Sequence, residues 1–82
     1  MDIDTNHYLT RDLPESAFLY TSGIKLIKTE IVGNGRRICF VFEDRNKCEE
    51  LVEKFMQKEG LVDAKTYSDS LRTLKDIVFN RI

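Results

Sequence analysis

Few side chains in this sequence have types suited to covalent chemistry or metal binding. The chain has one histidine, His7, and two cysteines, Cys39 and Cys48. A Cys–His dyad would require His7 to fold back from the N-terminus onto one of the cysteines. The same three residues lack the spacing of a zinc site, and the carboxylates are scattered. We therefore predict no catalytic residue, no metal ion and no cofactor, and we do not expect an enzyme.

Adjacent carboxylates and a glycine pair are the remaining chemical candidates. Glu43-Asp44 and Glu49-Glu50 are neighbours in sequence, but adjacent side chains on a strand or helix end point apart, so these pairs predict caps and surface charge. Gly33-Asn34-Gly35 resembles a phosphate loop only superficially, because a strand and not a helix follows it. We expect no small-molecule substrate.

The segment Ile24 to Asp44 predicts a β-hairpin that organises the chain. Asn-Gly between two apolar runs favours a two-residue type I′ turn at Asn34-Gly35. That turn predicts three cross-strand pairs, Ile31 with Ile38, Thr29 with Phe40, and Ile27 with Phe42. All six residues would share one face of the hairpin, which must then pack on helices because a lone hairpin is marginal in water.

Helix boundaries are predicted from capping residues. Asp12, with Glu15 three residues later, predicts the start of a first helix that Gly23 ends. A second helix begins after Asn46, carries an apolar stripe from Cys48 to Met56, and ends at Gly60. A third begins after Asp63 and runs nearly to the C-terminus, with its buried stripe at Ala64, Tyr67, Leu71, Leu74 and Val78 and with Phe79 off that stripe.

The predicted fold is therefore α+β, with the order α-β-β-α-α and the antiparallel hairpin packed against the second and third helices. The first helix is expected to close one end. A flexible N-terminal segment, 1–7, precedes a single domain at 8–82. Eighty-two residues leave no room for a second core.

Composition limits the partners and the compartment. Thirteen basic against 14 acidic residues give a net charge of −1, which argues against bulk attraction to nucleic acid or anionic membrane. No signal peptide or apolar run of transmembrane length is visible. We expect a cytoplasmic protein of a bacterium, an archaeon or a virus-infected cell, with both thiols reduced and a Cys39–Cys48 disulfide as the minor alternative.

Several short motifs carry a resemblance to a known family. They are Tyr8-Leu9-Thr10, Asp12-Leu13, Ala17 to Leu19, Gly23, Phe40-Val41-Phe42-Glu43 and Leu71-Arg72-x-Leu74-Lys75. Together they resemble a family of very small domains of unknown function from prokaryotes and viruses. The resemblance implies small proteins of prokaryotes and their mobile elements that act by binding. It transfers no catalytic residue.

The leading hypothesis is a binding module that docks on a protein partner or on a second copy of itself as a homodimer. The hairpin face opposite the predicted core combines charged and apolar residues, a composition typical of interfaces. Its candidate partner-binding residues are Lys28, Glu30, Val32, Arg37, Cys39 and Val41. By analogy alone, one form of this hypothesis is a mobile-element protein that inhibits a host protein.

The alternative hypothesis is a nucleic-acid-associated regulatory protein. Lys25, Arg36 and Arg37 lie on the two strands of the hairpin, and a β-ribbon with basic residues at its tip fits the major groove of DNA. Glu30 and Glu43 on the same hairpin oppose this reading.

Overall fold

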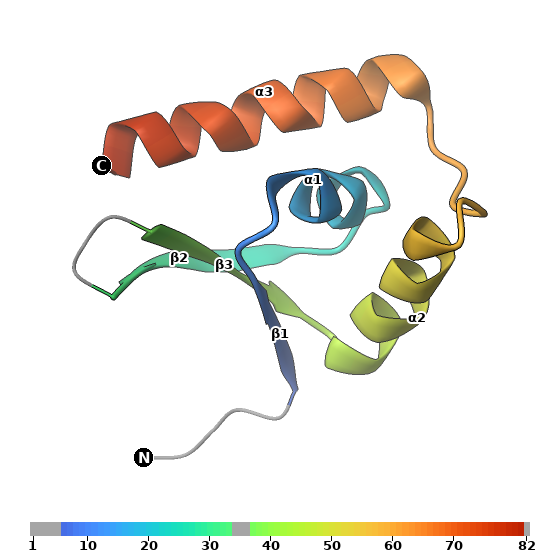
Figure 1. Cartoon of the computed structure of the whole chain (residues 1–82), viewed down its shortest axis with the longest axis horizontal. Helices are drawn as coiled ribbons and strands as arrows, with labels where there is room; N and C mark the ends of the chain where they lie inside the picture. The colour runs from blue at the N-terminus through green and yellow to red at the C-terminus, as the bar shows by residue number, and fades with distance from the viewer. Residues whose placement is uncertain (1–5, 34–36, 82) are drawn as a thin grey trace.

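The computed structural model describes residues 6–33 and 37–81 (Figure 1). The elements are β1 (His7–Thr10), α1 (Leu13–Thr21), β2 (Leu26–Val32), β3 (Arg37–Glu43), α2 (Arg45–Met56) and α3 (Ala64–Arg81). The predicted α+β class and the order α-β-β-α-α are confirmed, with one strand, β1, added in front.

The three strands form an antiparallel sheet in the order β1-β3-β2. Ile31 lies opposite Ile38 and Thr29 opposite Phe40, as the turn chemistry predicts, although the turn at Asn34-Gly35 itself lies outside the described residues. An irregularity between Leu26 and Lys28 then shifts the register, so that Leu26 takes the place opposite Phe42.

Because of this shift, one residue that was predicted to lie on the core face of the hairpin lies elsewhere. A bulge adds one residue to a strand and changes the face on which the following side chains lie. Leu26 therefore packs against the core, whereas Ile27 is 36% exposed. The prediction that placed Ile27 on the buried face is wrong because hydrophobic alternation alone carries no sign of a bulge.

Strand β1 pairs with the second half of β3, from Thr10 opposite Phe40 to His7 opposite Glu43. Four residues are too few to show strand periodicity, so the sequence did not indicate it. Of the N-terminal segment predicted to be flexible, residues 1–5 lie outside the described residues, and His7 is the first residue of β1.

Helix α1 begins and ends where its capping residues predict. The Asp12 carboxylate accepts a hydrogen bond from the backbone N–H of Glu15 at 2.8 Å. At the other end Gly23 has a φ of +96°, and the N–H of Ile24 donates to the carbonyl of Leu19 at 3.1 Å. This is the Schellman arrangement, in which glycine adopts the left-handed conformation without a Cβ penalty.

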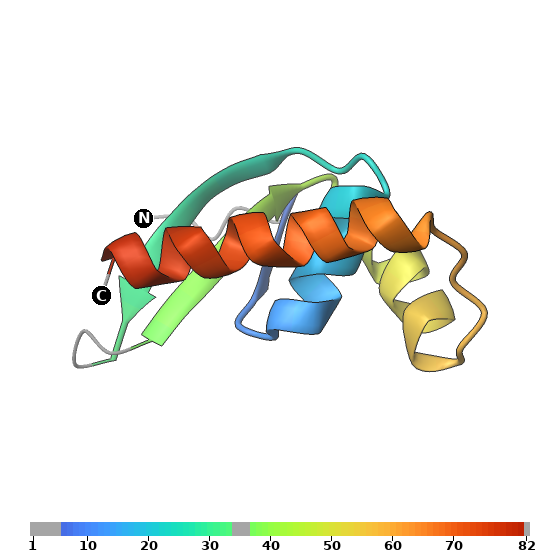
Figure 2. The ribbon, with the colours of Figure 1, turned by 90° about the horizontal axis from the view of Figure 1, so that it is seen from above.

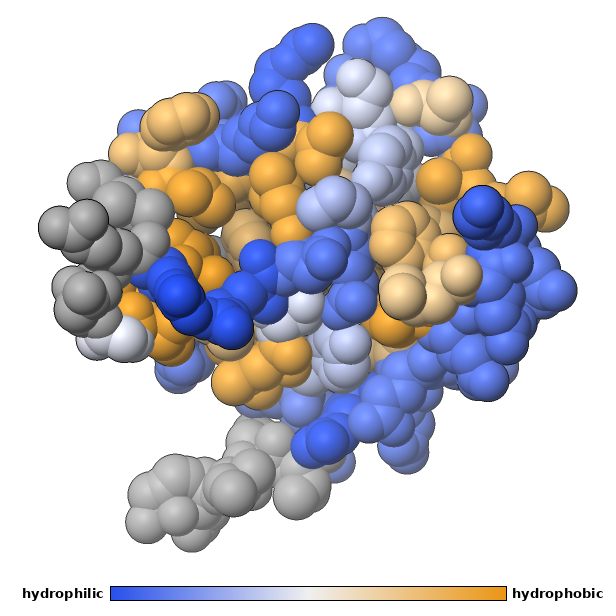
Figure 3. Space-filling model, in the orientation of Figure 1, coloured by the Kyte–Doolittle hydropathy of each residue, from blue (hydrophilic) through white to orange (hydrophobic). Residues whose placement is uncertain are grey.

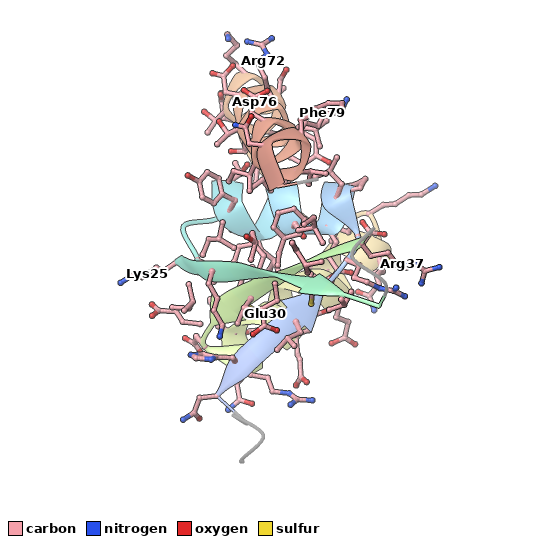
Figure 4. All side chains as sticks on the ribbon, turned by 90° about the vertical axis from the view of Figure 1, so that its left-hand side faces the viewer. Lys25, Glu30, Arg37, Arg72, Asp76 and Phe79 are labelled. Atoms are coloured by element: carbon pink, nitrogen blue, oxygen red, sulfur yellow. The ribbon has the colours of Figure 1, made fainter. Side chains whose placement is uncertain are left out.

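The position of α1 differs from the prediction. It lies between the sheet and α3 (Figures 1 and 4) and does not close one end of the domain. Four consecutive residues, Ser16 to Leu19, are buried, and a run of that length covers every side of a helix. The Ser16 hydroxyl donates to the carbonyl of Asp12 at 2.7 Å, which satisfies this buried polar group.

Helix α2 begins two residues earlier than predicted. Asp44 caps it in a left-handed conformation (φ +63°) by accepting the N–H of Lys47, so the prediction of Asn46 as the cap is wrong. Cys48 is fully buried at the start of the predicted stripe, whereas Met56 at its end is 71% exposed. The stripe contacts buried residues as far as Phe55, whose ring lies 5.1 Å from that of Phe18, and Met56 projects into solvent.

Gly60 does not end α2. Lys58 takes the left-handed position (φ +63°), and Glu59 donates its N–H to the carbonyl of Lys54 at 2.8 Å. Gly60 instead lies against the ring of Phe18, where an added Cβ would come within 2.5 Å of Cζ. The absence of a side chain at position 60 allows the loop to pass close to α1.

Helix α3 begins after its predicted cap, Asp63, which accepts hydrogen bonds from the N–H and the hydroxyl of Thr66 at 2.9 Å. The helix crosses over α1 and continues above the hairpin (Figure 2). Leu74 is fully buried, whereas Ala64 is exposed and does not belong to the buried stripe. The core contains Ala17, Leu19, Ile38, Phe40, Phe42, Cys48 and Leu74.

Candidate functional site

The predicted partner-binding residues do share one face of the sheet. Lys28 pairs opposite Val41, Glu30 opposite Cys39, and Val32 opposite Arg37. Glu30 lies on the face that turns away from α1 and α3 (Figure 4).

Two of the predicted apolar residues of that face are covered, contrary to the prediction. Cys39 and Val41 are only 6% and 3% exposed. Lys28 and Glu30 form an ion pair of 2.9 Å along β2. Leu9 pairs opposite Val41, so it shares that face, and it is 54% exposed. The face therefore presents both charge and the side chain of Leu9 to solvent.

The predicted nucleic-acid residues are not brought together as a group. Lys25 precedes β2, whereas Arg37 begins β3 beside the other end of β2, and seven extended residues span roughly 20 Å. Lys25 and Arg37 also lie at opposite lateral edges of the view in Figure 4. Arg36 lies outside the described residues.

The thiols are placed for packing. Burial raises the pKa of Cys48 to about 11, with the Asp44 carboxylate adding to the effect. Burial and then Glu30 also raise the pKa of Cys39. Both groups are therefore protonated near neutral pH, and a protonated thiol is a poor nucleophile. Cys39 and Cys48 are both free thiols in the structure, and neither forms a disulfide.

Other titratable contacts have structural roles. The Tyr8 hydroxyl donates to Glu15 at 2.8 Å, and burial followed by this hydrogen bond raises the pKa of Tyr8. This contact joins β1 to α1. Within residues 6–33 and 37–81, no three His, Cys, Asp or Glu side chains gather as a metal site would require.

A groove of about 660 Å³ opens between β3 and the C-terminal half of α3. It is hollowed on the face seen in Figure 3, where hydrophobic surface lies within it. We call it the β3–α3 groove. Its lining residues are Arg11, Leu13, Arg37, Ile38, Phe40, Lys75, Val78 and Phe79.

The position of α1 explains the groove. Because α1 lies between α3 and the sheet, it holds α3 about one helix diameter, roughly 10 Å, away from the strands. Where α3 continues past α1 above the hairpin (Figures 1 and 2), no helix fills that space within the described residues. Leu13, Val78 and Phe79 only partly fill it, and Phe79 remains 79% exposed.

All three charged side chains that line the groove are cations, namely Arg11, Arg37 and Lys75. Among the described residues, no ion pair joins any of them to a carboxylate. Ion pairs occur elsewhere on the surface, for example Arg45–Glu49 at 3.0 Å and Lys65–Asp69 at 2.8 Å.

The floor residues Ile38 and Phe40 are only 6% and 1% exposed, so the accessible apolar surface of the groove comes mainly from its walls, above all Phe79. The groove thus combines an apolar wall with positive charge that pairs with no carboxylate among the described residues.

A second hollow, of about 460 Å³, is different in kind. It lies between α2 and the start of α3, and its lining includes Lys47, Leu61 and Asp63. Charges of both signs are present there, and Leu61 is 94% exposed beside them. This hollow has neither a continuous apolar floor nor a single sign of charge.

Sequence reasoning missed the β3–α3 groove but had one signal for it. Phe79 falls off the predicted stripe of α3, and a large aromatic residue off a buried stripe is a candidate contact residue. Arg37 was included for a different face. Nothing in the sequence indicated that α1 would separate α3 from the sheet.

Fold and groove together define a small α+β domain with a basic, apolar-walled groove. The sequence matches the model of a family described as a domain of unknown function, DUF5659, over residues 5–80, and the chain belongs to this family. No curated protein matches the chain, and no solved structure matches it. None of the helices within the described residues has the length and apolar character needed to span a membrane.

Proposed function

We propose that this protein is a non-enzymatic binding module that holds a partner protein in the β3–α3 groove. One observation carries the proposal: three cations that form no ion pair within residues 6–33 and 37–81 surround an apolar groove in a chain whose net charge is −1. Apolar surface with complementary charge at its rim is the usual composition of a specific interface. The partner chemistry that fits is an acidic segment with apolar side chains.

Phe79 is the main apolar contact in this proposal. Exposed aromatic side chains are enriched among residues that dominate binding energy. Ile31, opposite Ile38 at the hairpin end, is 46% exposed and extends the same apolar surface. The proposed site thus shares only Arg37 with the face predicted from sequence. A host protein inhibited by a mobile-element product remains one form of the proposal, by analogy.

The experiment is a selection of displayed random peptides on the intact protein, followed by affinity measurements on matched variants. We expect enriched peptides that combine Asp or Glu with apolar residues. Phe79→Asp should weaken their binding by about tenfold or more. Leu61→Asp is the control, because Leu61 is also exposed but lies outside the groove. Both sites are exposed, so neither variant should unfold the domain.

Three results would overturn the proposal. They are the absence of any enriched peptide, enrichment without acidic residues, and equal losses in both variants. Analytical sedimentation of the free chain measures its oligomeric state as a further test. A species of one chain's mass supports a foreign partner, whereas a dimer that Phe79→Asp dissociates assigns the groove to a second copy.

Nucleic acid is the second candidate, because Arg11, Arg37 and Lys75 also suit phosphate oxygens. Its expected behaviour is distinct: binding to DNA or RNA that weakens steeply with salt and falls in Lys75→Glu. Absence of binding at low ionic strength would exclude it.

A further inference from the structure

Strand β3 is paired unequally along its length. Its second half, Phe40 to Glu43, has β1 on one edge and β2 on the other. Its first half, Arg37 to Cys39, is paired with β2 alone among the described residues. The chain leaves β1 at Thr10, passes through Arg11 and enters α1.

On the open edge of β3, the backbone groups of Arg37–Cys39 have no strand partner among the described residues. Successive residues of a strand direct their N–H and C=O groups to alternate edges. In a run of three residues, at least one therefore directs both groups to the open side. An unpaired strand edge is a template for another strand.

This open edge borders the β3–α3 groove. Arg37 and Ile38 line the groove, and they belong to the half of β3 that lacks a second neighbour. A chain placed beside them would lie in line with β1 and beneath the C-terminal half of α3. Arg37 and Phe79 lie on the same side of the molecule (Figure 4).

The two faces of such a chain would meet different surroundings. Side chains of a strand alternate between the faces of the sheet. On the helix side they would meet Ile38, Val78 and Phe79. On the far side they would meet the base of the Arg37 side chain, because Arg37 shares the face of Cys39, although its side chain also lines the groove with Arg11.

We infer that the groove takes an extended segment of a partner protein, with alternating apolar and acidic side chains, that pairs with Arg37–Cys39 as a continuation of β1. The inference rests on the proposed function and specifies the conformation of the bound segment. Strand addition of this kind draws affinity from main-chain hydrogen bonds and specificity from alternate side chains.

The outer edge of β2 is the competing edge, and it is less suited. It is longer, Leu26–Val32, but the irregularity between Leu26 and Lys28 interrupts its regular pairing. Bulges are a common device that prevents an edge strand from pairing with another chain. Neither the β3–α3 groove nor the second hollow is lined by a described residue of β2.

The test uses a peptide selected on the intact protein whose binding falls in Phe79→Asp. Each backbone nitrogen of the peptide is methylated in turn, which removes one hydrogen-bond donor. We expect losses of about tenfold at alternating positions and small effects between them. In the complex, hydrogen exchange should slow for one or more amides within Arg37–Cys39.

The outcomes separate the two proposals. A peptide that depends on Phe79 but tolerates methylation without alternation, or that becomes helical when bound, overturns the strand inference and leaves the proposed function intact. Alternating losses with protection on β2 instead of β3 also overturn it. If the library yields no peptide whose binding depends on Phe79, the proposed function itself is wrong.

Discussion

The two halves of α3 follow the same helical pattern but contact different surroundings. The part of α3 from Ala64 to Leu74 lies across α1, where Leu74 is fully buried and the Tyr67 hydroxyl donates to the carbonyl of Pro14 at 3.3 Å. The C-terminal half continues above the hairpin, where Val78 is half-buried and Phe79 is 79% exposed. What lies beneath the helix therefore decides whether an apolar residue stabilises the fold or remains available for binding.

The comparison predicts a steep change in mutational cost along one helix. Leu74→Ala should lower the free energy of unfolding by about 2–5 kcal/mol, because it removes a fully buried side chain and leaves a cavity. Phe79→Ala should change it by less than about 0.5 kcal/mol, as expected for an exposed position. Urea denaturation measures both, and similar costs at the two positions would show that α3 packs evenly along its length.

The loop before α3 should also be sensitive. Gly60→Ala brings a Cβ within 2.5 Å of the Phe18 ring, which should cost about 1–3 kcal/mol of unfolding free energy through overpacking. The control places the same change in a Phe18→Leu background, where the smaller side chain relieves the contact and the additional cost should shrink. If Gly60→Ala lowers the free energy of unfolding by the same amount in that background, the cause is the backbone conformation at Gly60 and not the contact with Phe18.

Charge reversal tests whether the C-terminal half of α3 contributes to partner binding. Lys75→Glu should reduce the affinity for a selected acidic peptide by about fivefold, the equivalent of roughly 1 kcal/mol. Lys65→Glu is matched in charge but lies at the opposite end of α3, outside the groove, and should leave the affinity unchanged. Equal losses of affinity in both variants would show that the effect comes from the change in net charge alone.

The smallest expected effect concerns the cap of α3. Hydrogen bonds from the N–H and hydroxyl of Thr66 lower the pKa of the Asp63 carboxyl in the folded state. A lowered folded-state pKa contributes stability above the unfolded value of about 3.8, and this contribution is lost as the pH falls through the folded value. Asp63→Asn should remove this dependence. Thermal melts of both proteins from neutral to acidic pH should therefore converge below pH 3.8, and parallel curves would contradict the cap.

Much of the fold follows from local sequence signals. Asp12, Gly23 and Asp63 mark helix ends because each satisfies backbone groups within a few residues. The pairing of Ile31 with Ile38 is the one that the Asn-Gly sequence predicts. The register holds as far as the irregularity at Leu26, which depends on tertiary packing. Local signals cannot report such packing.

The candidate site could not be predicted in the same way. The four-residue buried run Ser16 to Leu19 was visible only as part of a short helix, and its position between two layers is a global property. That position creates the groove. Likewise, the strand that flanks Val41 is β1, whose four residues carry too little periodicity to be recognised.

The most direct test of the proposed function is photocrosslinking in the protein's native cell, with a photoreactive amino acid at position 79 or at position 61. We predict a specific adduct with another protein from position 79, a lower yield of that adduct in Lys75→Glu, and its absence from position 61. Adducts that are identical from the two positions, or none from position 79, would contradict a partner in the β3–α3 groove.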